Sequence, residues 1–143
     1  MATYVGTTLC KNLFAVNNPS KFEKKLRKYG LRKESVDENI EGLWYERLGN
    51  KFRIYGYDRL QFYSSENQHY EEAEEFIQPF LKLGEKAIFI EVGTTKCRFD
   101  ESCGFAVIIT KNEVRYISLH DWVEEQILDM RNKEFHPKIT QNE

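Results

Sequence analysis

The region that decides the fold opens with the stretch YEEAEEFIQPFLKLG, which runs from Tyr70 to Gly84. Its apolar residues recur at the spacing i, i+3, i+4, i+7 and i+8, namely Ala73, Phe76, Ile77, Phe80 and Leu81. This spacing predicts a helix over residues 70–83 that packs through one face, and Gly84 is placed to end it. Pro79 cannot donate a backbone hydrogen bond, so we expect a kink or an early break near Gln78, and the continuing stripe favours the kink.

Three extended apolar runs follow this helix, at residues 87–92, 105–109 and 114–119. They are rich in the branched and aromatic residues that favour strands. The connections between them are too short for parallel crossovers. We therefore predict an α+β fold, with a single antiparallel sheet of about five to seven strands and two to three helices packed on it.

The first half of the chain has its own strand and helix signals. A strand is predicted over residues 3–9. Asn18 and Pro19 favour the start of a helix, and Gly30 favours its end. Residues 42–48 and 51–57 are predicted to pair as a hairpin around Gly49-Asn50, a dipeptide that supplies the positive φ values of a tight turn.

The C-terminal part of the domain is predicted to end in a helix. Asp121 forms a capping-box pattern with Glu124, and the residues predicted on the apolar side of this helix are Trp122, Val123, Ile127 and Met130. We expect a single domain over residues 1–131. Residues 132–143 are polar and are predicted to form a flexible tail.

The composition, with 41% hydrophobic and 14% aromatic residues, is that of a soluble globular protein. A formal net charge of −2 argues against a global attraction to nucleic acid or to membranes. Three cysteines and an N-terminus without a signal-like pattern predict a cytoplasmic protein with reduced thiols.

No residue spacing demands a particular chemistry, so we expect no enzyme, no cofactor and no metal. Cys103 and His120 could form a thiol and base pair, but an apolar strand follows the cysteine where a helix N-terminus would activate it. Cys97 and Cys103 could bind zinc with His120 or His136, but their spacing does not fit a zinc motif.

Charge is segregated along the chain. The lysines of the first predicted helix could contact nucleic acid: Lys21, Lys24, Lys25 and Lys28. The carboxylates of the second predicted helix could contact a basic partner: Glu71, Glu72 and Glu75. In both cases the alternative is a solvated helix face.

Aromatic residues are concentrated in the predicted hairpin. Strand alternation turns about half of them away from the core unless both faces of the sheet are covered. The candidate partner-binding set is Trp44, Tyr45, Arg53, Tyr55 and Tyr57, with one of Trp44 and Tyr45 facing outward. Exposed Tyr, Trp and Arg side chains are typical of interface hot spots. A second core layer is the alternative.

The run from Glu75 to Gly84, followed by alternating strands and turns, resembles part of small uncharacterised α+β proteins of bacteria, phages and mobile elements. This resemblance covers about a third of the chain. It implies a stoichiometric inhibitor, an immunity protein or an anti-defence protein. It implies no functional residue.

These observations together predict a non-enzymatic binding protein. Its partner is expected to be a protein, engaged through the aromatic and arginine surface of the sheet and one charged helix. The alternative is a nucleic-acid or nucleotide-binding module that uses the basic helix within residues 21–33. A homodimer is a further outcome, and no membrane partner is expected.

Overall fold

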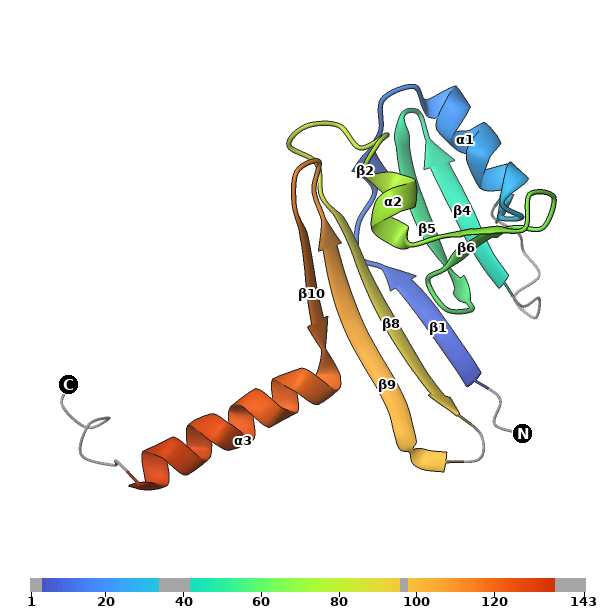
Figure 1. Ribbon diagram of the computed structural model, residues 1–143. Coiled ribbons are helices and arrows are strands. Elements are labelled where there is room, and N and C mark those ends of the chain that lie inside the picture. The colour runs from blue at the N-terminus through green and yellow to red at the C-terminus, as the bar shows by residue number, and fades with distance from the viewer. Residues whose placement is uncertain (1–3, 34–41, 96–97, 136–143) are drawn as a thin grey trace.

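Three helices and ten strands follow one another in the computed structural model, which describes residues 4–33, 42–95 and 98–135 (Figure 1). The helices are α1 (Pro19–Lys28), α2 (Ala73–Ile77) and α3 (Leu119–Phe135). The strands are β1 (Tyr4–Cys10), β2 (Phe14–Ala15), β3 (Arg32–Lys33), β4 (Gly42–Leu48), β5 (Lys51–Tyr57), β6 (Phe62–Ser64), β7 (His69–Glu71), β8 (Ala87–Thr95), β9 (Arg98–Ile109) and β10 (Val114–Ser118). The predicted α+β class is confirmed.

The main sheet has eight strands in the order β10-β9-β8-β1-β5-β4-β3, with β2 also paired to β5. It is mainly antiparallel, but β3 pairs with β4 in parallel. Strands β6 and β7 form a second, two-stranded sheet. The prediction of a single antiparallel sheet of five to seven strands was therefore wrong in detail. The unforeseen strands β2, β3 and β7 are two or three residues long, too short to show an alternating pattern.

One face of the main sheet is covered by α1, α2 and the small sheet, and the core lies between these layers (Figure 1). The centre of the core is aromatic. The ring of Phe22 in α1 meets that of Phe52 in β5 edge-on, with centroids 4.9 Å apart. Phe76 in α2 stacks on Phe62 in β6 at 4.1 Å. Such contacts contribute beyond the area that the rings bury.

The local signals of the first half predict the structure well. Asn18 caps α1 in a left-handed conformation with φ 51°, and its side chain accepts a hydrogen bond from Lys21 N–H. Pro19 occupies the first turn, and Gly30 follows the helix with φ 83°. Gly49, with φ 66°, turns the β4–β5 hairpin.

The helix predicted over residues 70–83 is much shorter than expected. Helix α2 has five residues, and Tyr70 and Glu71 belong instead to strand β7. The chain breaks near Pro79 rather than kinking there. Phe80 and Leu81 still pack on the core, but from a loop in which Leu81 bridges to Val16. Beyond Ile77, the apolar spacing therefore correctly indicated which residues are buried but wrongly indicated that they are helical.

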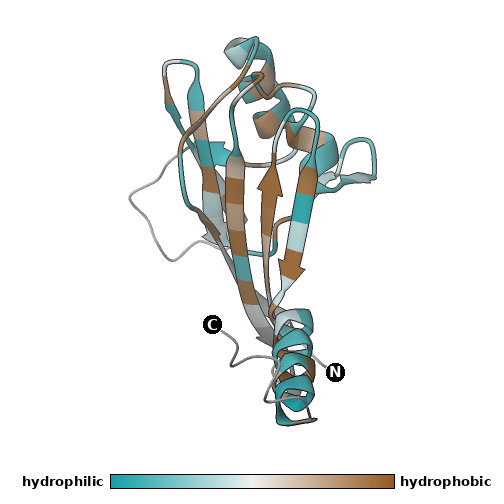
Figure 2. Cartoon of the chain, turned by 90° about the vertical axis from the view of Figure 1, so that its left-hand side faces the viewer, coloured by the Kyte–Doolittle hydropathy of each residue, from teal (hydrophilic) through white to brown (hydrophobic). Residues whose placement is uncertain are grey.

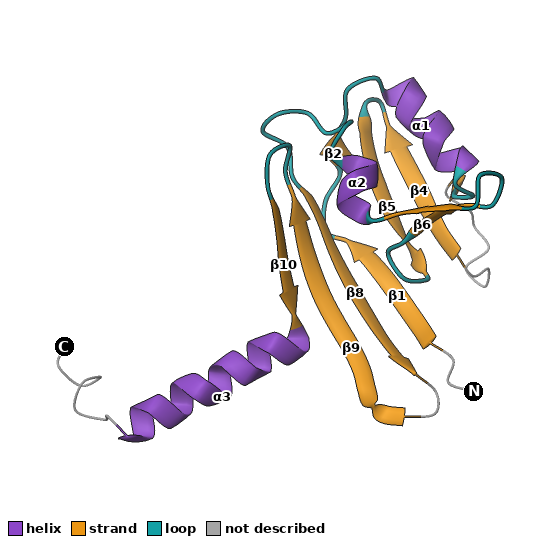
Figure 3. Cartoon of the chain, viewed as in Figure 1, coloured by secondary structure: helices purple, strands orange, loops and turns teal. Residues whose placement is uncertain are grey.

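Helix α3 begins earlier than predicted and does not pack along the sheet. Ser118 caps it by accepting a hydrogen bond from Asp121 N–H at 3.0 Å, so the predicted cap at Asp121 was wrong. The helix continues through residues 132–135, and the rest of the predicted tail lies outside the described residues. It projects from the end of β10, as Figure 3 shows. Of the three helices described, two cover the sheet.

Candidate functional site

The side of the main sheet opposite α1 and α2, here called the open face, carries apolar side chains. Ile108 and Ile109 illustrate the contrast: Ile109 is fully buried on the covered face, and Ile108 on the open face is 37% exposed. The strand registers bring together six open-face residues, called the aliphatic patch: Leu9, Ile90, Val92, Ala106, Ile108 and Ile117. Figure 2 shows apolar bands along these strands and on α3, which points toward the viewer.

Helix α3 carries a second exposed apolar surface. Its residues on one side, called the helix stripe, are Leu119, Trp122, Val123, Ile127 and Met130. Trp122 is 46% exposed and Met130 is 64% exposed. An apolar stripe at helical spacing normally faces a core, but this one faces solvent in the part of the chain that the structure describes. The sequence predicted the apolar side of this helix through Trp122, Val123, Ile127 and Met130. Of the two to three helices expected to pack on the sheet, α1 and α2 do so, and α3 projects from it.

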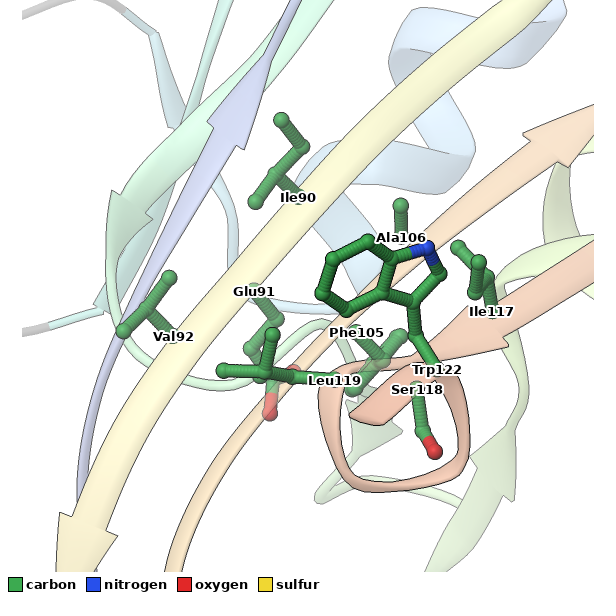
Figure 4. A pocket seen from close by; sticks show the side chains of 10 residues that line it. Ile90, Glu91, Val92, Phe105, Ala106, Ile117, Ser118, Leu119 and Trp122 are labelled. Carbon is green, nitrogen blue, oxygen red and sulfur yellow. The ribbon is translucent and has the colours of Figure 1, made fainter. Parts of the chain in front are cut away.

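The two surfaces meet in a hollow of about 270 Å³ at the junction of β10 and α3 (Figure 4). Leu119 and Trp122 from the helix face Ile90, Ala106 and Ile117 from the sheet. Leu119 lies over Gly104, where a Cβ atom would be 3.7 Å from Leu119 Cβ. The lining is almost wholly apolar, so the hollow suits a hydrophobic side chain rather than a charged ligand.

The other end of the open face holds the aromatic residues of the predicted set. The indole of Trp44 meets the rings of Tyr55 and Tyr57 edge-on, at 6.2 and 6.4 Å. Trp44 is almost completely buried, whereas Tyr57 is half exposed. We call Trp44, Arg53, Tyr55 and Tyr57 the aromatic patch. Its buried N–H groups, Trp44 Nε1 and Arg53 Nε, have no hydrogen-bond partner among the described residues.

Tyr45 points the other way, so it is not part of this surface. Its ring is buried in the core, and its hydroxyl donates a 2.7 Å hydrogen bond to Glu23 and accepts one of 2.8 Å from Arg27. Arg47 pairs with the same carboxylate at 2.8 Å. The hydrogen bond from Tyr45, assisted by these arginines, lowers the pKa of Glu23. This cluster fastens α1 to the β4–β5 hairpin.

The residues of the predicted acidic set differ in their exposure. Glu71 is held inward by a short hydrogen bond from the Tyr29 hydroxyl and by Lys25 at 3.1 Å. Burial alone would raise the pKa of Glu71, but these two partners outweigh it and the pKa is lowered. The same hydrogen bond raises the pKa of Tyr29 to about 12. Glu72 and Glu75 remain exposed.

The predicted basic set is reduced in the same way. Lys25 pairs with Glu71, and its ammonium group lies 4.4 Å from the centre of the Phe76 ring. Lys21, Lys24 and Lys28 are exposed on the outer side of α1. Because α1 covers the opposite face, these lysines and the open face lie on different sides of the molecule (Figure 1).

The structure describes only some of the residues considered as a thiol and base pair or as zinc ligands. Cys97 and His136 lie outside the described residues, and so does the side chain of Cys103. His120 is on the exposed surface of α3. Within the described ranges, no group of three or more His, Cys, Asp or Glu side chains is placed to hold a metal ion.

Sequence reasoning missed the aliphatic patch. The signal was present, because the runs 105–109 and 114–119 are apolar at consecutive positions and so place apolar side chains on both faces of a sheet. From the sequence, these runs predicted only strands.

No protein family, curated protein or solved structure matched this chain in the comparisons. Among the helices described, none combines the length and the apolar character needed to cross a bilayer.

Proposed function

We propose that this chain is a binding protein that recognises a protein partner through the open face of its main sheet. The observation that carries the proposal is the sidedness of that sheet. Helices α1 and α2 cover one face over its buried core and leave Tyr116 of β10 on that side 54% exposed, while the other face presents branched and aromatic side chains to solvent along β1, β5, β8, β9 and β10. Contiguous exposed apolar patches on a soluble domain are typical of interaction sites.

The composition of the open face favours a protein over a small ligand. Tyr57 and Tyr55, next to Arg53, are of the residue types that contribute most to protein interfaces, and the aliphatic patch continues the surface across β1, β8, β9 and β10. The surface is broad, and its hollow at α3 is shallow enough to leave Trp122 46% exposed. These features support a docking surface better than an enclosed catalytic pocket.

The charged helix of this proposal is α3 and not the segment 70–83. Helix α3 contains five acidic and two basic residues and adjoins the open face through its first turn. Glu72 and Glu75 belong to the layer on the covered face. The resemblance to inhibitor and immunity proteins predicts that binding blocks the partner, and this stays a prediction.

A capture experiment tests the proposal. The full chain, immobilised through its N-terminus, is compared with the variant Tyr55→Ala/Tyr57→Ala in cell lysate, with partners quantified by mass spectrometry. The matched control is Tyr63→Ala/Tyr70→Ala, which removes two exposed tyrosines whose ring centroids lie 4.4 Å apart on the covered side. We expect the first variant to lose at least ~10-fold of the captured partner and the control to lose none. Equal capture by both variants would contradict the proposal.

Nucleic-acid binding remains the second candidate, because Lys21, Lys24 and Lys28 are exposed along one side of α1. It predicts binding to mixed oligonucleotides that weakens with salt and is abolished by Lys21→Glu/Lys24→Glu/Lys28→Glu. Binding that is absent, or that survives this reversal, would eliminate it.

A further inference from the structure

We propose that the helix stripe of α3 docks on the aliphatic patch of a second copy of this chain, and that the second copy returns the same contact. The product is a symmetric dimer with two equivalent helix-on-sheet contacts. This inference rests on the proposed function in one respect, since it takes the open face to be a binding surface. It assigns the aliphatic end of that face to self-association and leaves the aromatic patch for another protein.

Helix α3 leaves most of its apolar side exposed in the described part of the chain. It has 17 residues, and only its first turn lines the hollow with the sheet. Helices of about this length are marginally stable in water, and those of folded proteins depend on packing of an apolar face. The stripe beyond that turn, from Val123 to Met130, is exposed. A surface that accepts it would stabilise the helix.

The same chain offers an apolar surface that can accept this helix. The aliphatic patch is apolar and uncovered among the described residues, and Leu119 and Trp122 already contact its edge (Figure 4). The helix nevertheless runs outward from β10, so its outer turns lie away from their own sheet (Figure 1). A second copy related by a two-fold axis can cover these turns and have its own helix covered in return.

The helix and the rim of the aliphatic patch carry opposite net charges. Helix α3 has an excess of three negative charges. The end of the aliphatic patch at Ile108 adjoins a hollow of about 360 Å³ that is also lined by Lys86, Arg115 and Glu113. Arg115 is paired with Glu113 at 2.7 Å, so the excess positive charge of this hollow is that of Lys86. Opposite charges at the rim favour this docking. The acidic helix is repelled by anionic lipid surfaces, so a membrane is the weaker alternative.

A reciprocal exchange buries a helix stripe and an aliphatic patch on each copy, and so has twice the area of a single helix-on-sheet contact. Stable protein interfaces bury roughly 1,600 Å² in total, so the reciprocal arrangement favours a stable dimer over a one-sided contact.

Sedimentation equilibrium of the full chain, from about 1 to 100 µM, tests the inference with neighbouring residues as controls. Wild type is expected to dimerise. Ile127→Glu, in the stripe, and Ile108→Glu, in the patch, should each weaken dimerisation at least ~10-fold. Leu128→Glu changes an exposed apolar residue that is next to Ile127 but outside the helix stripe, and should leave the dimer intact.

Mixing the two disrupted variants identifies the contact. Ile127→Glu retains a working patch and Ile108→Glu a working helix, so the mixture can form one of the two contacts and should associate where neither variant does alone. A wild type that stays monomeric, or that sediments with anionic vesicles instead of dimerising, would overturn the inference. So would a dimer that Ile108→Glu leaves intact, because that result indicates pairing of helix with helix. None of these results touches capture through Tyr55 and Tyr57, which tests the proposed function separately.

Discussion

The two faces of the main sheet are built from the same strands and the same kinds of residue, but they differ in what lies over them. On the covered face, Phe52, Phe89 and Ile109 are sealed beneath α1 and α2. On the open face, Val92, Ile108 and Ile117 have no such layer in the described part of the chain. The difference shows that apolar composition alone does not identify a core. The position of the helices decides which apolar face stabilises the fold and which is available for binding.

The largest expected effect is a difference in the free energy of unfolding between substitutions of two neighbouring residues that lie on opposite faces of the sheet. Ile109→Thr places a hydroxyl and a cavity in the core and should reduce the free energy of unfolding by about 3 kcal/mol. Ile108→Thr keeps the branched side chain on the open face and should change it by less than ~0.5 kcal/mol in the monomer. Urea denaturation of both, in an Ile127→Glu background that keeps the chain monomeric, makes the comparison. Equal losses would show that both faces are buried.

A second prediction concerns the charges that fasten α1 over the covered face. The pKa of Glu71 is lowered in the folded protein, so its contribution is complete above the ordinary carboxyl pKa, near 4.3, and is lost as the pH falls through the lowered value. Tyr29→Phe removes one cause of the shift and should flatten the acid loss of stability. Denaturation between pH 6 and about 2.5 measures it, with Tyr63→Phe as the control. An acid limb identical to wild type in Tyr29→Phe would contradict this assignment.

The same contact gives an alkaline signature. Tyr29 has a pKa of about 12 in the fold, raised from its ordinary value near 10. The stability that it contributes is therefore complete below pH 10 and declines as the pH rises toward 12. Glu71→Gln should lower the pKa of Tyr29, and absorbance of tyrosinate at alkaline pH reports the change. A Tyr29 titration unaffected by Glu71→Gln would show that the hydrogen bond does not form in solution.

The smallest effect is expected at the outer lysines. Replacing Lys21, Lys24 and Lys28 with Glu should change the free energy of unfolding by less than ~0.5 kcal/mol each, because their side chains point to solvent from the layer over the covered face. Thermal denaturation checks this at low and high salt. A large loss would indicate that α1 depends on these charges for its packing.

The sequence predicted local structure best where single residues have strong backbone preferences. Asn18, Pro19, Gly30 and Gly49 marked the ends of α1 and the β4–β5 turn correctly. The α+β class followed from the alternation of strand-like runs and helical stripes. Helix α2 was overestimated because Phe80 and Leu81 bury from a loop, which an apolar spacing cannot distinguish from a helical turn.

The candidate site was predicted only in part. Strand alternation correctly placed Tyr55 and Tyr57 on the side of the sheet away from the core. The sequence did not determine which of Trp44 and Tyr45 lies on that side. The pairing of Glu71 with Tyr29 and Lys25 joins residues more than 40 positions apart, so no local pattern reveals it. The exposure of the aliphatic patch depends on the direction in which α3 projects. A periodic apolar stripe predicts that a helix packs through that side, but it does not predict which surface the helix packs against.

The most direct test of the account is the solvent accessibility of isoleucine methyl groups by nuclear magnetic resonance, using a soluble paramagnetic agent on dilute full-length protein. We predict strong broadening for Ile108, Ile117 and Ile127, and none for Ile54, Ile77 and Ile109, which are fully buried. The first group should become protected as the protein concentration rises. Protection of Ile108 and Ile117 at every concentration down to the monomer would contradict the claim that this face is a docking surface.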